Sequence, residues 1–140
     1  MVKQLSVFLE NSKGRLAHLT RVLGEAGVDL QHLSIADTTN FGILRAIVSD
    51  NDVALKILKE QGYTVNITEL IAMSVPDKPG GLADALTALN DADIGIEYLY
   101  SFVRKPSQNA LILVKVDNAP KAVQALQLLG IKLLSQDELV

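Results

Sequence analysis

The chain has 140 residues, of which 49% are hydrophobic and none is cysteine, and its formal net charge is −3. This apolar fraction predicts a globular protein, and the missing cysteine excludes disulfides, thiolate metal sites and cysteine nucleophiles. Residues 1–68 hold seven basic and seven acidic groups and residues 69–140 hold six and nine, so neither half carries the positive footprint that nucleic-acid binding needs. No apolar run approaches the ~18 residues that span a bilayer, and the start lacks the apolar core of a signal peptide. We therefore expect a cytoplasmic protein without membrane contact.

The first half of the chain predicts the order βαββαβ. Alternating apolar residues indicate a strand over 3–9, and the polar turn Asn11-Ser12-Lys13-Gly14 closes it. Apolar residues at helical spacing predict a helix over 16–26. Two strands follow over 28–37 and 42–49, joined by a turn at 38–40. A helix over 50–61, with cap residues at 50–52, and a last strand over 63–68 complete the order.

The second half of the chain predicts the same order again, with a loop at 104–108 between its second and third strands. The expected elements are strand 69–75, helix 80–92, strands 94–103 and 110–117, helix 118–129 and strand 131–135. Such a split βαβ pair builds a four-stranded antiparallel sheet with both helices on one face, the ferredoxin-like α+β arrangement. We expect two such domains, 1–68 and 69–140, joined without a linker because residues 63–75 form one nearly continuous β-rich run.

The two halves also repeat each other in sequence. The turn that ends at Leu16 aligns with the turn that ends at Leu82, so equivalent residues of the two halves are 66 positions apart there. From Gly42, which aligns with Ala110, equivalent residues are 68 positions apart. Loop 104–108 accounts for the two extra residues. A repeat of about seventy residues is longer than a solenoid unit and long enough for a small domain with its own core.

The turn Asp77-Lys78-Pro79-Gly80-Gly81-Leu82, together with the βαββαβ order, resembles the ACT domain, a regulatory module that typically binds amino acids. In that family an acidic or amide residue and a Pro-Gly pair stand between the first strand and the first helix. Asp77, Pro79 and Gly80 match this pattern, and Asn11 and Gly14 match it with lysine in place of proline. The resemblance covers both copies and nearly the whole chain. It implies a non-catalytic protein that binds a free amino acid and regulates a partner, such as a metabolic enzyme, in trans.

The two turns are candidate ligand sites on chemical grounds as well. A glycine turn that leads into a helix leaves backbone N–H groups unpaired at the positive end of the helix dipole, where a carboxylate can dock. The ammonium of an amino acid then needs an acceptor, which Asn11 or Asp77 can supply. The candidate residues at the turns are Asn11, Gly14, Arg15, Leu16, Asp77, Gly80, Gly81 and Leu82. Two alternatives stay open: both turns are ordinary capped helix starts, and Arg15 either clamps a carboxylate or only lays its stem along the surface.

Two strand residues complete the candidate site. His32, Ser34 and Ala36 share one face of the second strand, and Tyr98, Tyr100 and Phe102 share the corresponding face in the second copy. The resemblance places this strand at the edge where neighbouring domains pair and share a ligand, so Ser34 and Tyr100 are candidates, with core or interface packing as the alternative.

No enzyme, cofactor or metal site is expected. The chain carries no nucleophile-elbow, zinc-protease, P-loop or dinucleotide motif, and its two histidines and scattered carboxylates do not have ligand spacing. Sheet edges left open in each domain predict a homodimer. A second hypothesis for the function is a non-catalytic regulatory or structural subunit of an amino-acid-metabolism enzyme that has no ligand of its own.

Overall fold

The computed structural model describes residues 1–37, 40–103 and 109–139. Its contacts divide the chain into two compact units, residues 3–68 and residues 69–140 with Met1–Val2, and each unit is described by itself. The predicted turn at 38–40 lies partly, and the predicted loop at 104–108 wholly, outside the described residues.

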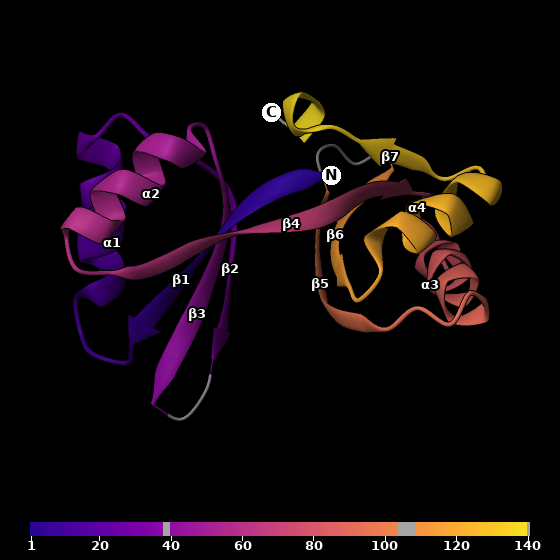
Figure 1. Ribbon diagram of the computed structural model, residues 1–140, viewed down its shortest axis with the longest axis horizontal. Coiled ribbons are helices and arrows are strands. Elements are labelled where there is room, and N and C mark those ends of the chain that lie inside the picture. The colour runs from indigo at the N-terminus through magenta and orange to yellow at the C-terminus, as the bar shows by residue number, and fades with distance from the viewer. Residues whose placement is uncertain (38–39, 104–108, 140) are drawn as a thin grey trace. The chain divides into compact units, whose positions relative to one another are not determined.

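The unit of residues 3–68 places two helices on one face of an antiparallel sheet (Figure 1). Its strand order is β2-β3-β1-β4. In chain order the elements are β1 (Val2–Glu10), α1 (Arg15–Glu25), β2 (Leu30–Asp37), β3 (Phe41–Val48), α2 (Asn51–Glu60) and the start of β4 (Thr64–Val75).

The core of this unit follows from two periodicities. Leu5, Val7 and Leu9 alternate along β1, so their side chains share one face of the sheet. Leu19 and Leu23 lie one turn apart on α1, so they share the helix face that packs against that sheet. All five side chains are buried, whereas Phe8, which alternates with them on β1, is 43% exposed.

The unit of residues 69–140 repeats this arrangement. Strand β4 pairs with β6 on one side and β7 on the other, and β5 pairs with β6, which gives the order β5-β6-β4-β7. The remaining elements are α3 (Gly81–Asp91), β5 (Ile96–Val103), β6 (Ala110–Val116), α4 (Ala119–Leu128), β7 (Lys132–Leu134) and the 3-10 helix η1 (Gln136–Leu139). Both units therefore have the strand order of the predicted ferredoxin-like fold.

Two elements differ from the sequence prediction. The strands predicted at 63–68 and 69–75, which the sequence joins in one nearly continuous β-rich run, form the single strand β4, since no glycine or proline interrupts Thr64–Val75. The short helix η1 was not predicted, since one turn of 3-10 helix is too brief to show a periodic pattern. None of the helices within the described ranges has the length and apolar character needed to cross a membrane.

Candidate functional site

The repeated turn has nearly the same backbone in both copies. Gly14 precedes α1 with φ 86° and ψ −9°, and Gly80 precedes α3 with φ 88° and ψ −12°. These angles lie in the left-handed region, which glycine enters without the steric cost that a side chain brings. In both units the chain therefore leaves a buried strand and enters a helix through a left-handed glycine.

The helices that follow these turns begin without a side-chain cap. Within the described part of the chain, no side chain caps the start of α1 or α3 with a hydrogen bond. At the other two helices the Asp50 carboxylate accepts from the amide of Val53 at 3.0 Å, and the Asn118 side chain accepts from the amide of Lys121 at 3.2 Å. The capped helix start offered as an alternative to a ligand site is thus present at α2 and α4 and not at the repeated turns.

Each uncapped helix start presents two amides without a protein partner. Hydrogen bonds within the turns use other donors: the Arg15 amide donates to Ser12 O at 3.4 Å and the Gly81 amide to Lys78 O at 3.0 Å. Among the described residues, the amides of Leu16 and Ala17 in the first copy and of Leu82 and Ala83 in the second have no acceptor. Adjacent N–H groups at the positive end of a helix can bind an anion such as a carboxylate.

The expected ammonium acceptors, Asn11 and Asp77, lie at the entry of these turns. Both are exposed, and neither caps the helix that follows. The amide of Asn11 donates to Asn40 O at 3.2 Å, which ties the first turn to the residue before β3. Each of the two residues precedes an uncapped helix by four positions in the sequence, and its side chain is accessible to solvent.

Gly81 closes the second turn. A Cβ built on Gly81 would lie 2.1 Å from Pro76 O. Arg15 occupies the aligned position in the first copy. The backbones of the two turns are therefore similar, but the first turn has space for a side chain at this position and the second does not.

Arg15 contacts a tyrosine of its own copy. Its guanidinium carbon lies 4.5 Å from the ring centroid of Tyr63, a side chain only 4% exposed, and the Tyr63 hydroxyl donates to Arg15 O at 3.4 Å. Nδ1 of His18 lies 2.6 Å from the same hydroxyl. Arg15 Nε is buried and has no hydrogen-bond partner. The Arg15 side chain is thus held against an aromatic ring, a cation–π arrangement.

The contact between His18 and Tyr63 was not predicted from the sequence. The only local signal was the position of Arg15 and His18 three residues apart on one helix. Ser34 and Tyr100 lie within strands rather than at the turns, opposite Arg45 and Leu113 respectively. Both are half-buried, and the side chain of Phe102 lies outside the described part of the structure.

No metal site is found in the residues described: they contain no group of three His, Cys, Asp or Glu side chains able to hold an ion.

Comparison with known proteins identifies the family. A family model described as an ACT domain pair matches residues 1–140, and the chain belongs to this family. Its structure is similar to the crystal structure of protein BT0572 from Bacteroides thetaiotaomicron, with 41% sequence identity and a TM-score of 0.92 over 99% of this chain and 94% of that one. The resemblance and the fold predicted from the sequence are thereby confirmed.

More distant structures share the fold. The regulatory subunit of aspartate kinase from Thermus thermophilus has 15% identity and a TM-score of 0.60, over 89% of this chain and 90% of that one. Aspartate kinase from Synechocystis has 20% identity and a TM-score of 0.59, and 89% of this chain matches 24% of that longer one. No curated protein matches the chain.

Proposed function

We propose that the protein binds a free α-amino acid at the turns before α1 and α3 and passes the occupancy to a partner protein that it regulates. The observation that carries this proposal is the contrast between the four helix starts. Side chains cap α2 and α4, whereas the two helices that follow the repeated turn leave amides open behind a left-handed glycine.

The chemistry of the turns suits a zwitterion. The ligand carboxylate accepts from the open amides, and the ammonium donates to the Asn11 or Asp77 side-chain oxygen. Hydrogen bonds to charged groups contribute roughly 1.5–3 kcal/mol each. Two or three of them account for a dissociation constant of ~0.1 mM, which corresponds to about 5.5 kcal/mol.

The family supports a regulatory role. The structure from Thermus thermophilus is, by its description, the regulatory subunit of aspartate kinase, and it shares the fold of this chain. We therefore propose that the partner is an enzyme of amino-acid metabolism. A cytoplasmic location is part of the proposal, since a chain without cysteine gains nothing from an oxidising compartment.

Thermal shift measurements with each of the twenty amino acids at 10 mM test the proposal. At roughly a hundred times the dissociation constant, linkage adds about 2.7 kcal/mol of stability, which raises the melting temperature by several degrees. Asn11→Ala and Asp77→Ala should reduce that shift. Asp91→Ala, at the far end of α3, is the matched control and should keep it. If no amino acid moves the melting temperature, the proposal is wrong.

We further propose that the protein is a homodimer that pairs through the β2 edge. Leu33 and Ile35 are 50% and 45% exposed there, although they stand opposite the core residues Ala46 and Leu44 and so share the core face of the sheet. A second copy of the edge would cover them. Light scattering of the wild type should give twice the mass of one chain. Light scattering of Ile35→Lys should give the mass of a single chain.

The same edge supports the second hypothesis, a subunit that holds its enzyme without a ligand. A dimer that persists while all twenty amino acids leave the melting temperature unchanged would favour that function.

A further inference from the structure

The two glycine turns differ in charge. Residues 11–18 hold two basic groups, Lys13 and Arg15, and no acidic one, so with histidine neutral their formal charge is +2. The aligned residues 77–84 have a formal charge of −1, from one basic and two acidic groups: Lys78, Asp77 and Asp84. The turns share their backbone and their open amides. A difference in ligand between them must therefore come from these side chains.

The two helices that follow the turns differ in the same direction. Helix α3 carries an acidic residue, Asp84, in its first turn, whereas the first turn of α1 has none. A carboxylate near the N-terminus of a helix interacts favourably with the positive end of the helix dipole. Asp84 supplies that negative charge to α3, and α1 lacks it. The start of α1 therefore attracts an anion more strongly than the start of α3.

Arg15 places a cation at this helix start. Its guanidinium is held over the ring of Tyr63, and within the described part of the chain it donates no hydrogen bond and forms no ion pair. A guanidinium has five N–H donors in a planar fork that matches a carboxylate. Arg15 directly precedes Leu16, whose amide is open, so both kinds of donor lie within a side chain's length of each other. The aligned residue of the second copy is Gly81, which has no side chain.

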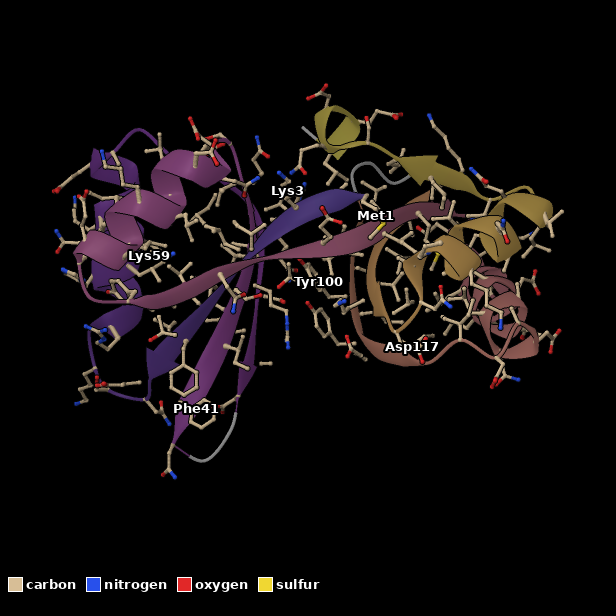
Figure 2. The ribbon with its side chains drawn as sticks, viewed as in Figure 1. Met1, Lys3, Phe41, Lys59, Tyr100 and Asp117 are labelled. Atoms are coloured by element: carbon tan, nitrogen blue, oxygen red, sulfur yellow. The ribbon has the colours of Figure 1, made fainter. Side chains whose placement is uncertain are left out.

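Other charged groups near the first turn do not cancel its positive charge. Glu10 comes just before the turn, but it alternates with the core residues of β1 and so lies on the sheet face away from α1. Tyr63 follows α2 and contacts Arg15, so the end of α2 lies beside the start of α1. That end carries Lys59, labelled in Figure 2, and Glu60, whose charges offset each other.

We infer that the first turn binds an amino acid with an acidic side chain, aspartate or glutamate. The α-carboxylate accepts from the open amides of Leu16 and Ala17, and the side-chain carboxylate accepts from the Arg15 guanidinium. The inference rests on the proposed function, since it uses the same turn. It adds that each chain binds one acidic amino acid, because the second turn has no cation in place of Arg15.

The charges of the two turns separate the ligand classes. An acidic amino acid has a net negative charge at neutral pH, so the basic first turn attracts it and the acidic second turn repels it. A basic side chain would meet the Arg15 guanidinium, and juxtaposed like charges oppose binding. An amide side chain accepts from the guanidinium without a charge of its own, and an apolar one leaves the guanidinium without a ligand partner, so both bind more weakly.

Calorimetric titration at neutral pH with two nearly isosteric pairs, aspartate against asparagine and glutamate against glutamine, tests the inference. We expect one site per chain for an acidic amino acid, filled at least about tenfold more tightly than by its amide, a ratio that corresponds to one charge-assisted hydrogen bond. Arg15→Met removes the guanidinium and should bring the acid and its amide to nearly equal affinity. Arg21→Met removes the same charge from an exposed position of α1, and this matched control should keep the preference.

The outcomes separate the inference from the proposed function. Amides bound as tightly as the acids, two equal sites for an acid in each chain, or a preference that persists in Arg15→Met would each overturn the inference while amino-acid binding itself stands. No binding of any amino acid by the wild type would overturn both. If Arg15→Met does not fold, Arg15→Gln replaces it, because that variant also lacks the positive charge, and a preference retained there would equally overturn the inference.

Discussion

Replacing Gly81 with alanine probes how tightly the second turn is closed. The new Cβ would lie 2.1 Å from Pro76 O, whereas ordinary contacts of a Cβ begin at 3.4 Å, so the backbone must move by about 1 Å. The obstacle is a carbonyl of the main chain rather than the end of a flexible side chain. Overpacking of this kind costs about 1–3 kcal/mol, and we expect Gly81→Ala to lose that much stability.

Gly24→Ala is the matched control for this measurement. Gly24 lies within α1, and a Cβ added there meets nothing within 4 Å. Alanine is preferred over glycine inside a helix by about 0.8–1 kcal/mol, so this variant should gain stability. Urea unfolding followed by circular dichroism gives both free energies. A Gly81→Ala protein within about 0.5 kcal/mol of the wild type would refute the close approach of Gly81 to Pro76.

Three further predictions concern the helix ends and one surface pair. Asp93 has a φ of 58°, so Asp93→Gly should raise the free energy of unfolding by about 0.5–1 kcal/mol in the same urea assay, and a loss of stability would contradict this. Asp50→Ala and Asn118→Ala should each cost about 1 kcal/mol through the lost caps of α2 and α4, with no change in the amino-acid affinity measured by calorimetry. The hydrogen bond from Lys132 holds the pKa of Glu138 below its ordinary value, with further bonds from Ser135, so Lys132→Met should raise that pKa in a carbon-detected NMR titration. Because the folded-state pKa of Glu138 is depressed, the pair stabilises the protein at pH values above the unfolded-state pKa, and this stabilisation is lost as the pH falls through the folded-state pKa. The free energy of unfolding of Lys132→Met should therefore fall less than that of the wild type when the solution is acidified.

The fold could be predicted because its signals are local. Alternation along 3–9 and the helical spacing of Leu19 and Leu23 each depend on residues near one another, and the repeat supplied every element twice. The turn was recognisable because a left-handed backbone favours glycine, which the chain has at Gly14 and again at Gly80. The β-rich run over 63–75 was recognisable because its signal is local too, and it forms the single strand β4 across the repeat boundary.

Contacts between distant residues could not be predicted in the same way. Tyr63 is 48 residues from Arg15 and 45 from His18, and no pattern within one element indicates that their side chains meet.

The central claim is that an amino-acid carboxylate docks on the uncapped amides at the start of α1 or α3. A ¹⁵N–¹H correlation titration with the amino acid that gives the largest thermal shift tests it most directly. The account predicts that the amides of Leu82 and Ala83, or those of the matching Leu16 and Ala17, move with ligand concentration. The amides of Val53 and Lys121, which Asp50 and Asn118 already cap, should stay in place. Saturable binding that leaves all four uncapped amides unmoved would contradict the claim.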